Sequence, residues 1–262
     1  MINKRIIPVI IIKNGLVVQS YGFKNYLPIG KPNFIVEFLS SWDSDEIIIL
    51  DIDASKQNRH LNLSLINELS KNVSVPLTVG GGISGLDVAE LYFKNGADKV
   101  AINSLFTAGK YELINEISEE YGSQSTVLSL DFIEDDFLNN SLFDYLKMEN
   151  LKMSVDEVMQ IVINEVEVGE IMVNSINRDG SKLGYDISLL TQISASINKP
   201  ILAIGGADKL NHFLDLFHLN NVTGLCAANV FLHSEHSVEL FRSEINHFKN
   251  CLRPNNYFQY EQ

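Results

Sequence analysis

Short runs of apolar and β-branched residues alternate along the chain with longer segments in which apolar residues recur every three or four positions. The runs predict buried strands and the longer segments predict amphipathic helices. The predicted strands cover residues 6–12, 47–52, 77–79, 100–102, 126–130, 171–173, 201–204 and 225–228. The predicted helices include residues 85–94, 111–121, 155–166, 187–197, 210–219 and 237–248. Continuous apolar strands that alternate with helices indicate a parallel sheet covered on both faces.

The two halves of the chain resemble each other. Residues 46–48 and 77–82 recur as residues 170–172 and 201–206, and the offset is 124 residues in both cases. A constant offset of about half the chain indicates two (β/α)4 half-barrel repeats. We therefore expect an α/β fold, a (β/α)8 TIM barrel that spans residues 1–262 as a single domain.

One segment between the predicted elements lacks a clear period. Residues 137–153 are polar and irregular, so they predict a long loop after the fifth strand.

Glycine-rich turns end two strands that correspond in the repeat. Gly81-Gly82 follows one strand and Gly205-Gly206 follows its partner. Chemistry in such barrels lies on the loops after the strands, and glycine lets a phosphate approach backbone N–H groups. The adjoining strand ends supply small or hydrogen-bonding residues: Asn103, Ser104, Ala228 and Asn229. Two similar turns predict a ligand with two phosphates, unless the glycines only permit tight turns.

Charge and composition exclude several classes of function. The chain has 20 Lys+Arg against 33 Asp+Glu, a formal charge of −13, so nucleic acid is not an expected partner. No apolar stretch approaches the roughly 20 residues that span a bilayer, so no membrane association is expected. Cys226 and Cys251 are too few for a disulfide framework, which predicts reduced cysteines in a cytoplasmic protein. Neither cysteines nor histidines have a metal-ligand spacing, and we expect no metal and no cofactor.

Eight motifs along nearly the whole chain carry a resemblance to a known family. They are Lys4-Arg5-Ile6-Ile7-Pro8, Leu50-Asp51-Ile52, Pro76-Leu77-Thr78-Val79-Gly80-Gly81-Gly82-Ile83, Gly96-Ala97-Asp98-Lys99-Val100, Ile102-Asn103-Ser104, Gly122-Ser123-Gln124, Arg178-Asp179-Gly180 and Gly184-Tyr185-Asp186. In this order they resemble the HisF cyclase, the barrel subunit of imidazole glycerol phosphate synthase. The resemblance implies a heterodimer with a HisH-like glutaminase that docks at the bottom of the barrel and supplies ammonia. At the top, the ammonia is used to cleave and cyclise a bis-phosphorylated ribonucleotide of histidine biosynthesis.

The resemblance also implies two catalytic aspartates, at the ends of the first and fifth strands. Asp131 matches the second, whereas Ile11 stands at the position of the first. Isoleucine cannot carry a proton, and a positioned acid–base group contributes roughly 10²–10⁴-fold to a rate. We therefore expect weak or no cyclase activity unless Asp51, the nearest other carboxylate, substitutes. Gln19 likewise stands where the family has a lysine on the mobile loop after the first strand.

Four charged residues stand where strands begin, which places them together at the bottom of the barrel: Arg5, Glu46, Lys99 and Glu170. Mutual pairing allows two cations and two anions to persist in a constricted place, and on the residues alone they could simply plug the barrel floor. The resemblance implies instead that they are the family's ammonia gate, and that Asp98 touches the glutaminase. Thr78 and the apolar residues Val9, Ile48 and Ala101 would then line a path for neutral ammonia, since ammonium is costly to desolvate.

An intact ammonia gate below an altered upper site leaves three hypotheses. The first is a barrel subunit of a glutamine amidotransferase complex that binds a glutaminase and passes ammonia onward. The resemblance implies as acceptor a sugar amidotransferase that forms acetamidino groups in surface-polysaccharide biosynthesis. The alternative is a working cyclase of histidine biosynthesis, for which Asp131 and Asp51 must suffice. The third is a non-catalytic scaffold for a phosphorylated small molecule, which predicts no glutaminase contact and no effect of charge reversal at Asp98.

Overall fold

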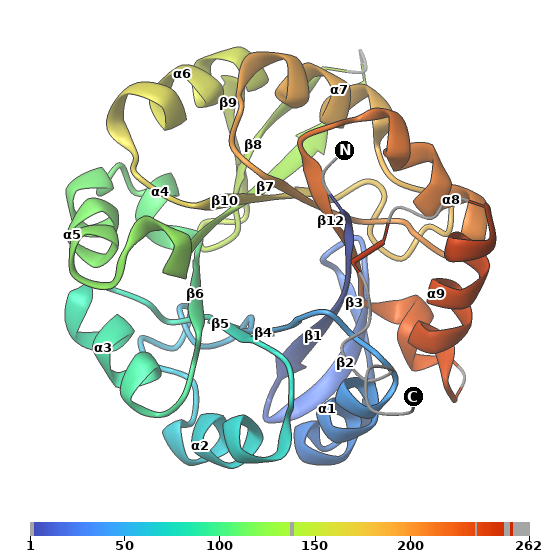
Figure 1. Cartoon of the computed structure of the whole chain (residues 1–262). Coiled ribbons are helices and arrows are strands. Elements are labelled where there is room, and N and C mark those ends of the chain that lie inside the picture. Colours follow the sequence, from blue (N-terminus) through green and yellow to red (C-terminus); the bar gives the residue numbers. More distant parts are fainter. Residues whose placement is uncertain (1–2, 137–138, 234, 249–251, 254–262) are drawn as a thin grey trace.

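Eight parallel strands close into a barrel with the helices outside it (Figure 1). The computed structural model describes residues 3–136, 139–233, 235–248 and 252–253; Cys251 and part of the predicted loop, residues 137–138, lie outside the described residues. The hydrogen-bonded order is β10-β11-β12-β1-β4-β5-β6-β7, and β10 also pairs with β7, which completes the ring. The predicted (β/α)8 barrel is therefore confirmed.

The bounds of the barrel elements agree closely with the predicted ones. The barrel strands are β1 (Arg5–Lys13), β4 (Ile47–Asp51), β5 (Leu77–Gly80), β6 (Lys99–Ile102), β7 (Thr126–Glu134), β10 (Glu170–Ser175), β11 (Ile201–Ile204) and β12 (Val222–Ala227). The α-helices are α1 (Pro32–Ser41), α2 (Leu63–Asn72), α3 (Leu86–Lys94), α4 (Ser104–Thr107), α5 (Tyr111–Tyr121), α6 (Val155–Glu165), α7 (Ile187–Ser196), α8 (Leu210–Leu214) and α9 (Ser237–Phe248). The predicted helix 210–219 is α8 followed by a 3-10 turn, η2 (Asp215–His218), and a further 3-10 turn, η3 (Asn229–Leu232), follows β12.

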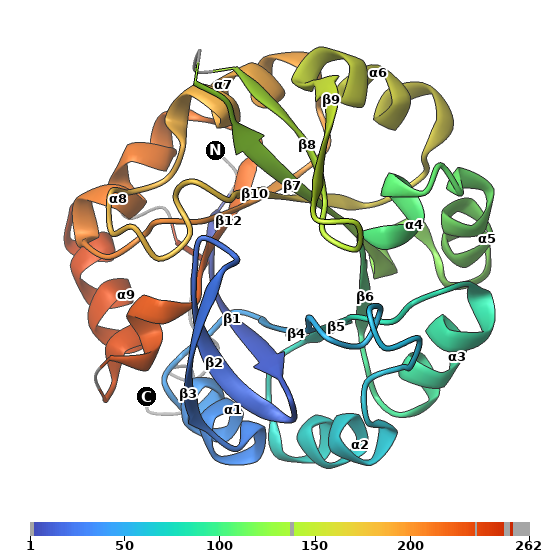
Figure 2. The same ribbon diagram turned by 180° about the vertical axis from the view of Figure 1, so that it is seen from behind.

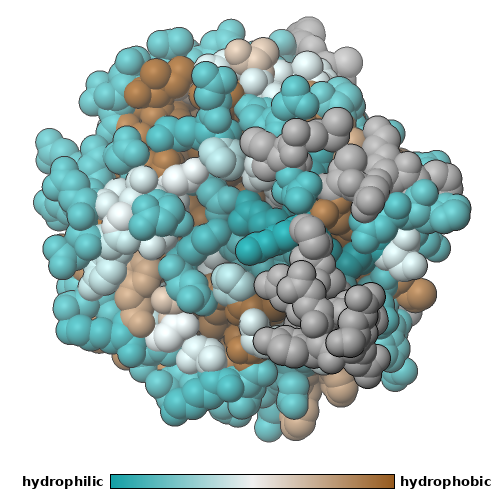
Figure 3. Space-filling view, viewed as in Figure 1, coloured by the Kyte–Doolittle hydropathy of each residue, from teal (hydrophilic) through white to brown (hydrophobic). Residues whose placement is uncertain are grey.

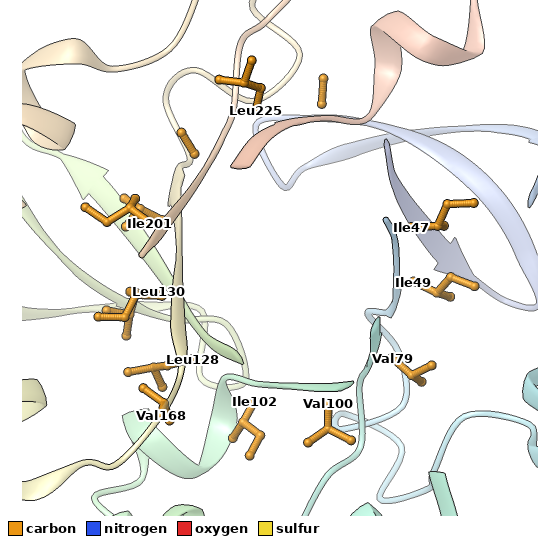
Figure 4. Close-up of a cluster of buried hydrophobic side chains, with 14 of the residues drawn as sticks. Ile47, Ile49, Val79, Val100, Ile102, Leu128, Leu130, Val168, Ile201 and Leu225 are labelled. Atoms are coloured by element: carbon orange, nitrogen blue, oxygen red, sulfur yellow. The ribbon is translucent and has the colours of Figure 1, made fainter. Parts of the chain in front are cut away.

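Alternate residues of each barrel strand face opposite sides of the sheet. Side chains such as Ile47, Val79 and Leu128 point away from the barrel axis toward the helices (Figure 4). A second, separate apolar cluster fills the interior of the barrel: Ile7, Val9, Ile48, Ala101, Val127, Met172, Leu202, Ile204 and Cys226. The barrel is thus a packed core whose two ends are available for polar groups.

Two antiparallel hairpins extend the barrel on one face, which Figure 2 presents. β2 (Leu16–Tyr21) and β3 (Asn25–Gly30) follow β1, while β8 (Asn140–Asp144) and β9 (Glu149–Ser154) follow β7. The prediction of an irregular loop at residues 137–153 was therefore wrong for these strands. The reason is that β7 runs on to Glu134 and offers its edge to β8, with Phe132 opposite Leu142. Among the described residues no helix combines the length and hydrophobicity needed to cross a membrane.

Candidate functional site

A cavity of about 140 Å³ opens at the C-terminal ends of the barrel strands. We call it the upper cavity. All the residues that the sequence assigns to the catalytic and phosphate-binding sites contribute to its lining: Ile11, Asp51, Gly81, Gly82, Asn103, Ser104, Asp131, Gly205, Gly206, Ala228 and Asn229. They come from both halves of the barrel and meet because parallel strands end on the same side of the sheet.

Asp131 is a buried carboxyl near the end of β7, with 7% of its surface exposed. Asn174 on β10 donates from Nδ2 to Oδ1, and Asn103 donates from Nδ2 to Oδ2, both over 3.1 Å. Burial raises the pKa of Asp131 to about 7, although the two amide donors oppose the rise. Such a group can both accept and release a proton near neutral pH, which is what general acid–base catalysis requires.

Ile11 and Asp51 stand on the neighbouring strands β1 and β4, across the barrel from β7. Ile11 lines the upper cavity and adds only an apolar surface. The carboxylate of Asp51 accepts from Arg59 Nη1 over 2.7 Å and from Nη2 over 3.2 Å. Its Oδ1 also accepts the backbone N–H groups of Asp53 and Ala54. Asp51 is therefore held by a guanidinium and two backbone donors, whereas the partners of Asp131 are two neutral amides.

The glycine turns have a backbone conformation that suits close approach. Gly82 and Gly206 have φ angles of 70° and 86°. A Cβ on Gly82 would lie 2.1 Å from the carbonyl oxygen of Arg59, and one on Gly206 would lie 2.3 Å from that of Gly184. The glycines are thus required by packing against neighbouring backbone, independently of any ligand. The N–H of Gly82 donates to Ser55 Oγ over 3.0 Å, which places a hydroxyl beside the first turn.

The polar residues assigned to the phosphate sites have different environments. Asn103 is held by Asp131 and by the carbonyl of Ser129, at 2.9 Å. Asn229 donates from Nδ2 to the carbonyl of Ser20 on β2 over 2.8 Å and accepts the N–H of the same residue. Asn229 therefore ties the β2–β3 hairpin to the barrel rim. Ser104 and Ala228 simply line the cavity.

Four charged side chains meet at the opposite end of the barrel, and we call them the charged ring. Arg5 pairs with Glu46 over 2.8 Å and with Glu170. Lys99 pairs with the same two carboxylates, over 2.9 and 2.6 Å. Burial alone would raise the pKa of Glu170, but the adjacent cations hold it below its usual value. The face viewed in Figure 3 has hydrophilic atoms at its centre, where the strands begin.

Two further residues assigned to this end have defined positions. Thr78 donates from Oγ1 to Glu46 Oε1 over 2.6 Å, directly above the charged ring. Asp98 is exposed, and its Oδ2 accepts the N–H of Leu77 over 2.8 Å. The apolar interior cluster, which includes Val9, Ile48 and Ala101, separates this end from the upper cavity.

The sequence did not predict that side chains of the two hairpins line the upper cavity. Phe23 and Tyr26 of the first hairpin and Tyr145 of the second line it. Gln19 on β2 is buried and accepts the hydroxyl of Tyr21 over 3.1 Å. Aromatic residues near turns are the only sequence signal for these contacts. Within the described residues, no group of three or more His, Cys, Asp or Glu side chains is arranged to hold a metal ion.

Comparison with known proteins agrees with this geometry. The family described as "Histidine biosynthesis protein" matches residues 5–237. The "Putative imidazole glycerol phosphate synthase subunit hisF2" of Vibrio vulnificus is 38% identical over 261 residues, covering 100% of this chain and 95% of the relative. The "Imidazole glycerol phosphate synthase subunit HisF" of Francisella philomiragia is 33% identical, covering 96% and 98%. A second "Putative imidazole glycerol phosphate synthase subunit hisF2", of Pseudomonas aeruginosa, is 34% identical, covering 92% and 95%. The chain therefore belongs to the histidine biosynthesis protein family, as a HisF-like member that has Ile11 in place of the first-strand aspartate.

Proposed function

We propose that this chain is the ammonia-using barrel subunit of an imidazole glycerol phosphate synthase and works with a HisH-like glutaminase subunit. The observation that carries the proposal is Asp131, a buried carboxyl of pKa about 7 in the cavity where the predicted upper-site residues meet. The relatives' names support the hypothesis of a cyclase in histidine biosynthesis. They do not support ammonia delivery to a sugar amidotransferase, the first hypothesis from the sequence.

The two ends of the barrel have separate tasks under this proposal. The glutaminase docks at the end with the charged ring, where Asp98 is exposed. Ammonia passes the ring and moves along the apolar interior as the neutral molecule, because ammonium would lose its hydration there. The turns at Gly82 and Gly206 bind the two phosphates of the ribonucleotide, so that its reacting part lies between them near Asp131.

Ile11 limits the rate in this proposal. With Asp51 engaged by Arg59, Asp131 is the one predicted catalytic carboxyl with only neutral amide partners. One acid–base group of two is then lacking, which costs roughly 10²–10⁴-fold in rate. Restoring it by Ile11→Asp is the direct test of the assignment.

The experiment measures ammonia-dependent turnover of the bis-phosphorylated ribonucleotide by the purified chain, by Ile11→Asp and by Asp131→Asn. We expect slow turnover by the unaltered chain, an increase of at least about tenfold for Ile11→Asp, and loss of activity for Asp131→Asn. Ile11→Val is the matched control, because it keeps an apolar β-branched side chain and should leave the rate unchanged. No turnover by any of the folded variants would exclude the proposal.

A second candidate is delivery of ammonia to a separate acceptor enzyme, such as a sugar amidotransferase. Ile11 is the observation that favours it, since the charged ring is complete whereas the upper cavity has an apolar side chain where the resemblance implies a catalytic aspartate. The same experiment discriminates the two functions. Turnover by Ile11→Asp but not by the unaltered chain, with glutamine hydrolysis still stimulated in the complex, would support delivery.

A further inference from the structure

The two hairpins lie on the same face of the barrel, presented in Figure 2, and side chains of both line the upper cavity. Tyr145, in the turn between β8 and β9, is where they touch. Its ring and that of Phe23 form a T-shaped pair with centroids 5.6 Å apart and an interplanar angle of 86°. Its hydroxyl lies near enough to that of Tyr26, on β3, for each to affect the pKa of the other. One side chain of the second hairpin thus contacts both the turn and the second strand of the first hairpin.

Lys56 covers the face of the same ring. Its Nζ lies 3.7 Å from the ring centroid of Tyr145 and 3.4 Å from Sδ of Met148. None of the ion pairs between described residues includes Lys56. A cation over an aromatic face is attracted by the ring quadrupole, more strongly where it is desolvated. Tyr145 therefore has an aromatic partner, a cation over its ring and a second hydroxyl near its own.

The backbone of Phe23 is further evidence that this contact is specific. Phe23 has a φ of 58°, in the left-handed region that a bulky residue rarely adopts. Such a conformation is strained and persists where surrounding contacts stabilise it. Here the contacts are the Tyr145 ring and the carboxylate of Asp179, which accepts the N–H of Phe23 over 3.3 Å.

We propose that Tyr145 is a positioning residue that holds the β2–β3 hairpin over the Asp131 cavity. Phe23, Tyr26 and Tyr145 all line that cavity, so their contacts cover its mouth and keep water from Asp131. Gln19, where a lysine is expected, faces Tyr21 and His233 within the fold. The positioning role of Tyr145 does not depend on the proposed function. Only the identity of the reaction in the cavity beneath the hairpin does.

The test is hydrogen exchange of the full chain, compared with Tyr145→Ala and Tyr145→Phe. We expect exchange in residues 16–30 to rise at least about tenfold in Tyr145→Ala, because the hairpin opens locally. Tyr145→Phe keeps the ring contacts and should rise by only about twofold to threefold. The control is Lys147→Ala in the same turn, whose ammonium pairs with Asp144 and Glu149 and which should leave residues 16–30 unchanged.

Two results would overturn the inference: unchanged exchange at residues 16–30 in Tyr145→Ala, or an equal rise throughout the barrel, which would indicate a general loss of stability. Turnover adds a second readout. A positioning role predicts a lower kcat for Tyr145→Ala and recovery in Tyr145→Phe, whereas a rise in KM alone would indicate direct substrate contact and contradict it. Because exchange needs no substrate, its outcome stands even if the unaltered chain fails to turn over the ribonucleotide.

Discussion

At the scale of single residues, the environment of Asp131 decides what the upper cavity can do. Apolar walls and burial disfavour its ionised form, and two neutral amides only partly offset that effect. Asp51 has the opposite environment, with a guanidinium and two backbone N–H groups on its oxygens. Asp131 is thus suited to proton transfer, whereas Asp51 is suited to holding the loop after β4 through Asp53, Ala54 and Arg59.

The raised pKa of Asp131 predicts a pH-dependent cost in stability. Below about pH 4 the group is protonated in both folded and unfolded chains. As pH rises toward 7, the unfolded chain ionises while the folded chain keeps the proton, so stability is progressively lost. The interval between pH 4 and pH 7 corresponds to about 4 kcal/mol. Asp131→Asn should therefore gain stability relative to the unaltered chain as pH rises over this interval.

Chemical denaturation of both proteins at pH 4.5, 6 and 8 measures that difference. The informative quantity is its pH dependence, because the loss of one hydrogen bond in the variant shifts all three values alike. Asp51→Asn is the control, because it makes the same substitution at the other carboxyl of the cavity, which pairs with Arg59. A difference between Asp131→Asn and the unaltered chain that is constant across pH would mean that Asp131 ionises as an ordinary aspartate.

The positions of Asp131 and Ile11 could be predicted because Asp131 follows one predicted strand, Ile11 lies near the end of another, and the resemblance assigns a role to each position. Their partners could not. Asn174 reaches Asp131 because β10 pairs with β7 in a register that sets these two residues side by side. That register depends on closure of the whole barrel, and no spacing in the sequence reports it.

At the scale of elements, the glycine turns fix how strand ends pack on neighbouring loops. We expect Gly206→Ala to lower the free energy of unfolding by about 2–4 kcal/mol, because a positive φ and a close backbone oxygen both oppose a side chain. Gly109→Ala is a matched control: Gly109 has a φ of 69°, but nothing lies within 4 Å of the added Cβ. It should cost only about 1 kcal/mol. Equal losses in the two variants would mean that backbone conformation alone explains the glycine.

The barrel strands were predictable and the hairpin strands were not, for a physical reason. Barrel strands such as β11 are buried on both faces and appear as continuous apolar runs. β3 and β9 expose most of their residues, so their sequences show neither an apolar run nor a clean alternation. Their pairing follows from the neighbouring strand instead. The elements that cover the cavity are therefore those that the sequence specifies least locally.

At the scale of the whole molecule, the charged ring joins both halves of the barrel. Its members stand on β1, before β4, and at the starts of β6 and β10. The ring carries two positive and two negative charges, so its electrostatic balance belongs to the closed barrel and to no single half. Removing one carboxylate leaves a buried cation with too few partners, and this is costly.

A double-mutant cycle tests this coupling. Glu46 has 2% of its side chain exposed and pairs with both Arg5 and Lys99, so Glu46→Gln should lower the free energy of unfolding by about 3–5 kcal/mol. Lys99→Met removes a cation from the same ring and should also destabilise the protein when introduced alone. The double variant leaves Arg5 paired with Glu170 and restores neutrality, so its loss should be at least about 1 kcal/mol smaller than the sum of the single losses. If the losses in free energy of unfolding are instead additive, the four charges act as independent pairs. The ring is then not the coupled network that its geometry indicates.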